Sequence, residues 1–403
     1  MRRDPNTVKA ALAEVERQHL TRERRVIESF PVANSRAEVV VNGRRLVDFC
    51  SNDYLGLARH PAISTAMAEC AALAGAGSGA SHMVTGHGVE HQRLEEELAA
   101  FLGCERALLF STGYMANLAV VATLADRGEV VALDRLNHAS LIDGTLLSGA
   151  RFSRYAHGDP GDAERVLKEH NGQCTVLATD GVFSMDGDVA RLPTLARLSR
   201  AYKAWLVVDD AHGIGVLGQT GRGLVEHFEL ASAEVPVLVG TLGKAFGTFG
   251  AFVAGATDLI ELLAQKARTY IYTTALPQPV AAAARKSLEL MQKESWRRER
   301  VLALAARFRA AARQLDLHLT PSESAIQPVI LGAADLAVRA QNELMDAGFL
   351  VVGIRPPTVP AGTARLRITF SAAHTEEQVD ALVEALGRIQ TSVPSPKRSE
   401  AHG

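Results

Sequence analysis

The chain of 403 residues is longer than a typical single domain, so we expect a large domain with at least one smaller one. Its 43 basic and 45 acidic side chains nearly balance, and no basic block is interleaved with aromatic residues, which argues against a nucleic-acid partner. The N-terminus continues into a charged amphipathic pattern and no apolar run reaches membrane-spanning length, so the sequence predicts a soluble, cytoplasmic protein.

The cysteines and histidines form no recognised ligand motif. Cys50, Cys70, Cys104 and Cys174 are scattered without a Cys-x-x-Cys pair, which favours reduced thiols over disulfides or zinc ligands. None of the 13 histidines falls in a His-Glu-x-x-His pattern. The sequence therefore predicts no metal.

Residues 1–50 are predicted to form an N-terminal arm. An arginine-rich helical pattern covers residues 7–29. Two apolar runs over 37–41 and 45–49 then flank Asn42-Gly43, a strong signal for a hairpin turn.

Residues 51–290 are predicted to form the large domain, in which helices and strands alternate. The glycine-dense segment 75–81 must be a loop between helices. The predicted helices cover 61–73, 89–102 and 115–124, and the predicted strands cover 106–110, 130–133, 176–178, 205–209 and 237–239. This alternation predicts an α/β fold with a mostly parallel sheet covered on both faces, and ligands at the carboxyl ends of its strands.

Residues 291–390 are predicted to form a smaller α+β domain, and 391–403 a disordered tail. Long helices over 280–291 and 296–315 lead into it. The predicted elements that follow are a strand over 327–331, a helix over 336–347, strands over 349–354 and 364–370, and a helix over 376–389.

Lys244 ends an apolar strand within the glycine-rich run 237–250. A lysine at the mouth of a buried strand loses hydration that favours the ammonium form, so its amine becomes available as a nucleophile or base. A phosphate-binding loop is excluded, because Leu238 occupies its first glycine position and Ala245 follows the lysine. A Schiff-base lysine and an ordinary surface lysine both remain compatible with this spacing.

Three other strand ends allow a functional and a plain interpretation. Segment 111–114 precedes helix 115–124, so its backbone N–H groups would either face an anion or form an ordinary helix cap. Asp209 would either raise the proton affinity of a heterocyclic nitrogen or serve as a capping acid. His138 would either stack on a cofactor ring or belong to the core.

The segment 213–218 matches a dinucleotide-binding fingerprint in its glycine spacing. That fingerprint requires a helix directly after it, whereas the glycine-containing segment 219–223 follows here. We therefore interpret the match as accidental. A dinucleotide oxidoreductase built on it remains a competing hypothesis, which predicts that Lys244 is inessential.

The strand-end residues together suit pyridoxal phosphate (PLP). This cofactor needs a lysine for its aldehyde, an acid for its ring nitrogen, an anion site for its phosphate and a flat side chain for its ring. Four strand ends supply these parts: Lys244 is the lysine, Asp209 the acid, segment 111–114 the anion site and His138 the flat side chain.

Six motifs are spread along the chain: SNDYLGL (51–57), DRLNHAS (134–140), DGVFSMDG (180–187), VDDAHG (208–213), TLGK (241–244) and IRPPTVPAGTARLR (354–367). With them the sequence resembles the α-oxoamine synthase family of fold-type-I PLP enzymes. The last motif and SAIQP (324–328) resemble the alanine-using branch of biotin biosynthesis.

The resemblance implies roles for individual residues. Lys244 would hold PLP covalently and then remove the α-proton of the amino acid, Asp209 would pair with the pyridine nitrogen, and His138 would stack on the ring and contact substrate. The further cofactor contacts implied are Gly113, Tyr114, Ser184, His212 and Thr241, with Thr273 and Thr274 reaching the phosphate in the partner subunit. The further substrate contacts implied are Arg22, Asn52, Arg355 and Thr358.

The resemblance also implies a homodimer that condenses L-alanine with a pimeloyl thioester, on CoA or an acyl carrier protein, and releases CO₂. Asp180 stands where that branch has glutamate, and segments 136–144 and 240–244 also resemble glycine-using 2-amino-3-ketobutyrate CoA ligases. Condensation of glycine with acetyl-CoA is therefore the nearest alternative, and an inactive relative that serves as a partner protein is a third. His82 stands where the family often has arginine.

Overall fold

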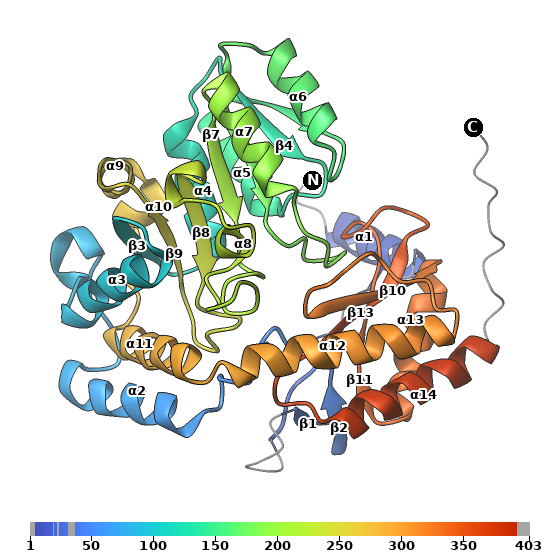
Figure 1. Cartoon of the computed structure of the whole chain (residues 1–403). Coiled ribbons are helices and arrows are strands. Elements are labelled where there is room, and N and C mark those ends of the chain that lie inside the picture. Colours follow the sequence, from blue (N-terminus) through green and yellow to red (C-terminus); the bar gives the residue numbers. More distant parts are fainter. Residues whose placement is uncertain (1–4, 19, 22–23, 31–36, 393–403) are drawn as a thin grey trace. The chain divides into compact units, whose positions relative to one another are not determined.

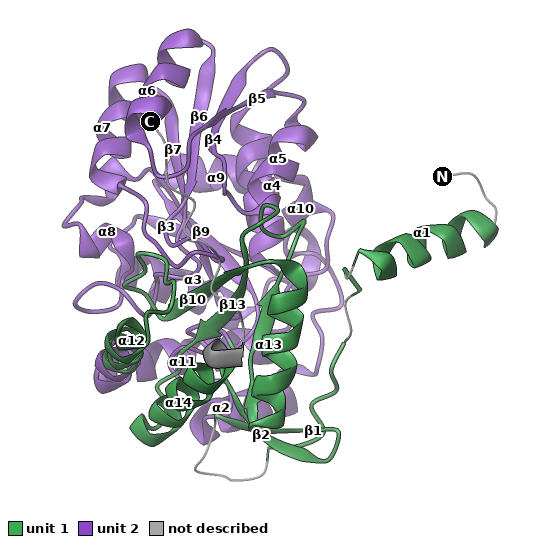
Figure 2. Cartoon of the chain, turned by 90° about the vertical axis from the view of Figure 1, so that its right-hand side faces the viewer, with its two compact units in different colours: residues 1–51, 303–403 green, residues 52–302 purple. Residues whose placement is uncertain are grey.

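The computed structural model describes residues 5–18, 20–21, 24–30 and 37–392. The chain forms two compact units, one of residues 52–302 and one that combines residues 1–51 with 303–403 (Figure 2). The predicted segments 1–50, 51–290 and 291–390 remain a prediction. Among the described residues, no helix is long and apolar enough to cross a membrane.

A seven-stranded sheet forms the centre of unit 52–302, in the order β3-β9-β8-β7-β6-β4-β5 (Figure 1). Its strands are β3 (Arg106–Phe110), β4 (Val130–Asp134), β5 (Arg151–Tyr155), β6 (Cys174–Asp180), β7 (Trp205–Asp209), β8 (Val237–Thr241) and β9 (Ala251–Gly255). Only β9 runs antiparallel to its neighbours, β3 and β8, among these strands. The predicted mostly parallel sheet is confirmed, although β5 and β9 were not predicted.

Helices pack on this sheet because its strands are apolar on both faces. Val131 and Val207 in the strands form one buried cluster with Val120 of α4 and Ile260 of α9. The helical segments are α2 (Pro61–Ala74), η1 (His82–Gly86), α3 (Val89–Leu102), α4 (Gly113–Leu124), α5 (Ala139–Ser148), α6 (Pro160–Glu169), α7 (Leu192–Tyr202), α8 (Leu224–His227), η2 (Ser232–Glu234), α9 (Thr257–Lys266), α10 (Arg268–Ile271) and α11 (Gln278–Lys293).

The other unit contains two small sheets. One has the order β1-β2-β11, and the other is antiparallel with the order β10-β13-β12. The elements are α1 (Pro5–Arg17), β1 (Glu38–Val41), β2 (Arg44–Asp48), β10 (Ile326–Gly332), α13 (Ala334–Asp346), β11 (Phe349–Leu350), β12 (Val352–Ile354), β13 (Ala364–Thr369) and α14 (Glu376–Ser392). Helix α12 (Trp296–Gln314) contains the division between the units.

Two predictions for this unit were wrong in detail. The helix predicted over 7–29 ends at Arg17, and Glu28 and Ser29 pair with β1 instead: Val40 N donates to Ser29 O and Glu28 N to Val40 O. The strand predicted over 349–354 is split, since β11 pairs with β2 and β12 pairs with β13. The predicted hairpin and the α+β character are confirmed.

Candidate functional site

The carboxyl ends of β4, β6, β7 and β8 carry the predicted functional residues of the large unit. Lys244 lies half-buried in the loop after β8, and Asp209 is the last, buried residue of β7. His138 lies at the start of α5, after β4. The predicted convergence at one edge of the sheet is therefore seen for these three residues.

A chain of hydrogen bonds leads away from Lys244. Its Nζ lies 2.7 Å from His212 Nε2, and His212 Nδ1 lies 2.6 Å from the hydroxyl of Tyr54. The Tyr54 hydroxyl donates to Asn52 Oδ1 at 3.2 Å, so His212 donates from Nδ1 and keeps its Nε2 lone pair for Lys244. Tyr54 is fully buried, which holds this chain in place. The amine therefore faces an acceptor of defined orientation.

The loop that carries Lys244 is held by Thr241 and by a glycine. Thr241 Oγ1 donates to Gly250 O and accepts from Gly243 N, so its hydroxyl shapes the loop. Gly247 has a φ of 64°, and a Cβ there would lie 2.3 Å from Ala58 N. A side chain at residue 247 would thus displace the loop.

Asp209 and His138 are linked through Asn117, which the sequence did not indicate. Asn117 Nδ2 donates to Asp209 Oδ2 at 2.6 Å and to Ser140 Oγ at 2.8 Å. Ser140 Oγ lies 2.6 Å from His138 Nδ1, and Tyr114 contacts the His138 ring edge-on at a centroid distance of 6.1 Å. Burial lowers the pKa of His138, so its ring is neutral and free to stack on an aromatic group.

Two further carboxyl groups surround Asp209. Burial and then the charge of Asp209 raise the pKa of Asp180 to about 8. Burial also raises the pKa of Asp210 to about 8, and the charge of Asp209 adds to it. Near neutral pH both neighbours are therefore largely protonated, so the negative charge at this strand end is concentrated on Asp209.

The start of α4 fits an anion. Thr112 caps this helix by accepting from Met115 N, and a Cβ on Gly113 would meet no atom within 4 Å. The helix is 12 residues long, so its N-terminal N–H groups carry a substantial dipole. With the lysine amine, the acid and the neutral imidazole, this donor set fits PLP. Ser184 lies in the turn after β6, half-buried.

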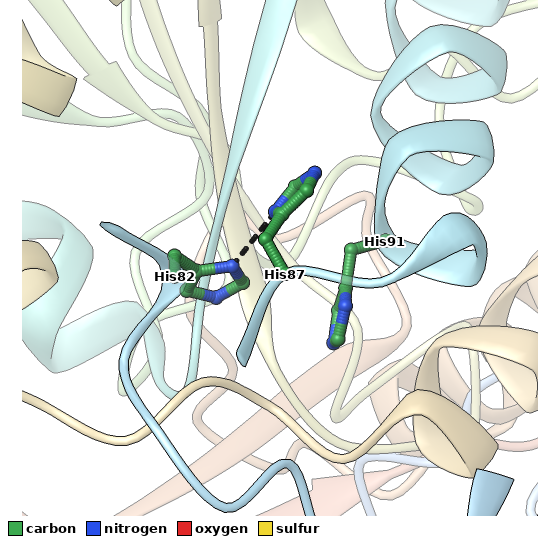
Figure 3. A group of neighbouring side chains, drawn as sticks. All are labelled: His82, His87 and His91. Atoms are coloured by element: carbon green, nitrogen blue, oxygen red, sulfur yellow. Dashed lines mark hydrogen bonds between the residues drawn. The ribbon is translucent and has the colours of Figure 1, made fainter. Parts of the chain in front are cut away.

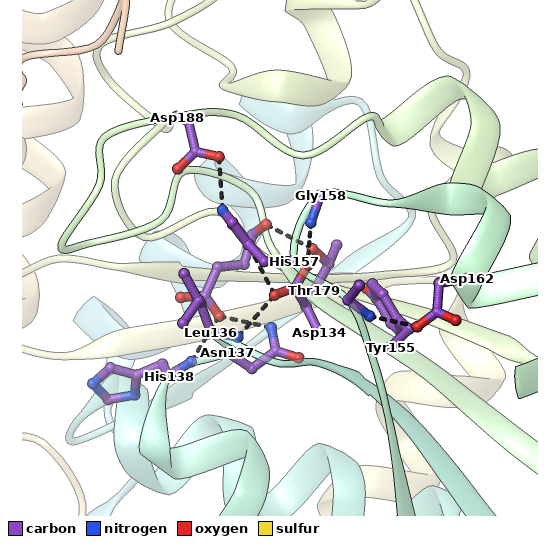
Figure 4. A network of polar contacts seen from close by, with 12 residues as sticks. Asp134, Leu136, Asn137, His138, Tyr155, His157, Gly158, Asp162, Thr179 and Asp188 are labelled. Carbon is purple, nitrogen blue, oxygen red and sulfur yellow. Dashed lines mark hydrogen bonds and ion pairs between the residues drawn. The ribbon is translucent and has the colours of Figure 1, made fainter. Parts of the chain in front are cut away.

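His157 joins the end of β4 to the loop that follows β6 (Figure 4). Its Nδ1 lies 3.0 Å from Asp134 Oδ1 and its Nε2 3.0 Å from Asp188 Oδ2. Burial alone would lower the pKa of His157, but hydrogen bonds to the two carboxylates and then their charges raise it to about 10. The imidazolium therefore bridges the ends of β4 and β6.

We expect His157→Gln to lower the free energy of unfolding by about 2 kcal/mol at pH 7. The pKa of His157 lies above the unfolded value of about 6.5, so the stabilisation is complete below that pH and is lost as the pH rises through about 10. Urea unfolding at several pH values should therefore show the two proteins converging near pH 10. A constant difference would contradict a charged bridge.

The remaining predicted site residues are Thr273, Thr274, Arg355, Thr358 and Arg22. Thr273 and Thr274 follow α10 beside the glycine-rich loop, where Ala275 N donates to Ala80 O. Arg355 and Thr358 belong to the other unit, in which Arg355 Nη2 donates to Thr21 O. Arg22 lies outside the described residues.

The dinucleotide alternative is not supported by the fold. Residues 211–221 form consecutive turns and bends, and the first helix after them is the short α8. Gly215 and Gly218 have φ values of 88° and 82°, which explains glycine at both positions without a ligand. The interpretation of this spacing as accidental is confirmed.

Comparisons with known proteins agree with this geometry. The family model for aminotransferase class I and II matches residues 44–386. The 8-amino-7-oxononanoate synthase of Methylococcus capsulatus is 58% identical over 94% of this chain and 96% of its own, and that of Cellvibrio japonicus is 55% identical over 96% of each. A serine palmitoyltransferase variant from S. paucimobilis, bound to a PLP–myriocin adduct, has a TM-score of 0.91 with 30% identity, covering 97% of this chain and 99% of that one.

Proposed function

Because the chain belongs to the aminotransferase class I and II family, and within it to the 8-amino-7-oxononanoate synthases, we propose that it condenses L-alanine with a pimeloyl thioester. The products are 8-amino-7-oxononanoate, CO₂ and the free thiol of CoA or an acyl carrier protein. The observation that carries this assignment is the 55–58% identity to synthases of this name over more than nine-tenths of the chain.

The cofactor is PLP, which supplies an electron sink for the carbanion of the amino acid. Lys244 would hold its aldehyde carbon, Asp209 its ring nitrogen and His138 its ring face. The start of α4, with Gly113 and Tyr114, would hold the phosphate together with Thr241. Ser184 and His212 would hold its phenolic oxygen side.

Lys244 is the proposed base for the α-proton. His212 Nε2 lies 2.7 Å from its Nζ and carries a lone pair, so it restrains the amine and accepts a proton from it. His212 is in turn oriented by the buried Tyr54 hydroxyl. The chain from Lys244 to Asn52 thus orients the group that must meet the Cα–H bond.

The proposed substrate contacts are Asn52, His138, Arg355, Thr358 and Arg22. Arg355 carries a planar guanidinium that suits bidentate pairing with a carboxylate. Thr358 N donates to Arg355 O, which fixes the turn that carries both residues. We further propose a homodimer in which Thr273 and Thr274 reach the partner's cofactor phosphate.

Thiol release should distinguish the proposed reaction from its nearest alternative. We expect the PLP-loaded protein to release thiol with L-alanine and pimeloyl-CoA, and at least about 10-fold more slowly with glycine and acetyl-CoA. Glycine lacks the methyl group of alanine and acetyl-CoA lacks the long acyl chain, so both bind the transition state more weakly. The measurement is a continuous thiol assay of the two mixtures in parallel. Release in the second mixture alone would replace the proposal by a glycine C-acetyltransferase.

A further inference from the structure

Three histidines outside the strand-end site meet over residues 82–91 (Figure 3). His82 is the first residue of η1, His87 directly follows η1, and His91 lies in the first turn of α3. One ring nitrogen from each lies within 4.8 Å of the other two. His82 and His91 are buried, and His87 is half-buried.

The closest pair already shares one proton. His82 Nδ1 and His87 Nδ1 are 2.9 Å apart, so one of them donates and the other accepts. Tetrahedral zinc with Zn–N distances of about 2.0–2.1 Å holds two nitrogens about 3.3 Å apart. Replacing the shared proton by such an ion therefore requires a shift of only a few tenths of an ångström.

His91 has the orientation that a third ligand needs. Its Nε2 donates to the backbone carbonyl of Leu276, which leaves the lone pair on Nδ1. A carbonyl acceptor on the far nitrogen is the usual outer contact of a metal-binding histidine. Gly88 N now donates to this Nδ1 at 2.9 Å, so an ion must displace that hydrogen bond. We expect the affinity to be weaker than that of a structural zinc site for this reason.

The surroundings keep the cluster rigid. His82 stacks on Tyr270 with centroids 4.9 Å apart and planes at 9°. A Cβ on Gly86 would lie 2.1 Å from Ala80 O, so the backbone between the histidines is tightly packed. Imidazole rings that are already held in place lose little freedom when they bind an ion.

We propose that His82, His87 and His91 form a binding site for one divalent transition-metal ion of the zinc class, with water completing a tetrahedral shell. Imidazole ligands suit zinc, cobalt, nickel and copper rather than calcium or magnesium. The spacing His-x₄-His-x₃-His matches neither the Cys-x-x-Cys nor the His-Glu-x-x-His pattern, so the sequence alone predicted no metal. The bound ion would join η1 to α3.

The test uses untagged, PLP-loaded protein after removal of metals with a chelator. Calorimetric titration with zinc chloride should give one site per chain with micromolar affinity, and Co(II) should give the visible absorption of a tetrahedral complex. His87→Gln should weaken zinc binding at least about 10-fold, because it removes one of three ligands. His318→Gln removes an exposed histidine elsewhere and should leave the affinity unchanged.

Either of two results would overturn the site: no binding by the parent protein, or equal affinity for the parent and His87→Gln. His82→Gln provides a second variant should His87→Gln fail to fold, and the melting temperature of each variant is measured first. Zinc should also raise the melting temperature of the parent and not that of His87→Gln. These readouts do not depend on the condensation activity, so they stand apart from the proposed function.

Discussion

Lys244→Ala is expected to lower kcat for thiol release by at least about 1,000-fold, since under the proposed function the variant would lack both the amine that holds PLP and the base for the α-proton. The local geometry supports this expectation. Lys244 Nζ contacts His212 Nε2, and His212 is fixed by the buried Tyr54. No neighbouring group in this chain of contacts is a second primary amine.

The matched control is Lys266→Ala. Lys266 is an exposed residue in the last turn of α9, so its replacement removes a lysine without touching the strand-end site. Both variants should melt within a few degrees of the parent, because neither residue belongs to the buried core. The kcat of the control should equal that of the parent.

A second readout identifies the lysine directly. Borohydride reduction of the PLP-loaded parent should leave the cofactor attached to the peptide that contains Lys244, as found by mass spectrometry. Methylamine should partly restore the rate of Lys244→Ala, because a free amine can replace the missing side chain. A Lys244→Ala protein with the full rate would contradict both the PLP chemistry and the role of this residue.

The sequence could predict the parallel core of the sheet because its strands are buried apolar runs. Strand β4 is buried at every residue, which gives a continuous hydrophobic signal. Strand β5 pairs only with β4, at the edge of the sheet, and most of its Arg-Phe-Ser-Arg-Tyr residues are exposed, so no such signal exists. Strand β9 is short and directly follows the glycine-rich loop, so its residues did not stand out as a separate strand.

The candidate site was predicted only where motif and strand end coincide. Lys244 and His138 each follow a predicted strand, and Asp209 ends one. Tyr54 and Asn117 were not predicted as partners of these residues. Tyr54 is 158 residues away in sequence from His212, which it contacts, and Asn117 lies within an apolar helix. Their roles depend on which elements become neighbours in space, and a single sequence does not contain that information in local patterns.

The cluster of His82, His87 and His91 also depends on which elements become neighbours in space. Each of His82, His87 and His91 stands alone among unrelated residues, and a helix turn and a π-helical turn bring them together. His157 likewise occupies a turn after β5 and gains its function only from Asp134 and Asp188 on other elements. Lone histidines in a sequence are most often core residues, so only the folded geometry singles these out.

Asp209→Asn is expected to lower kcat/KM for the condensation by about 100- to 1,000-fold while the protein remains folded. In the proposed function the negative charge of the acid would keep the ring nitrogen of the cofactor protonated, and an amide of the same shape carries no charge. The change also opposes one donor, because Asn117 Nδ2 and Ala211 N donate to different oxygens of the Asp209 carboxylate and the amide can accept from only one of them. Thiol release with L-alanine and pimeloyl-CoA measures the loss.

The matched control is Asp210→Asn, which makes the same substitution at the next residue. Burial raises the pKa of Asp210 to about 8, so near pH 7 the amide replaces a largely neutral acid. Its side chain can still accept from Leu224 N, as Asp210 Oδ2 does. The control should therefore keep its rate within about 3-fold of the parent.

If both variants lost activity equally, the effect of Asp209→Asn would reflect disturbed packing at the end of β7. A large loss confined to Asp209→Asn would identify the charge of Asp209 as the feature that the reaction requires.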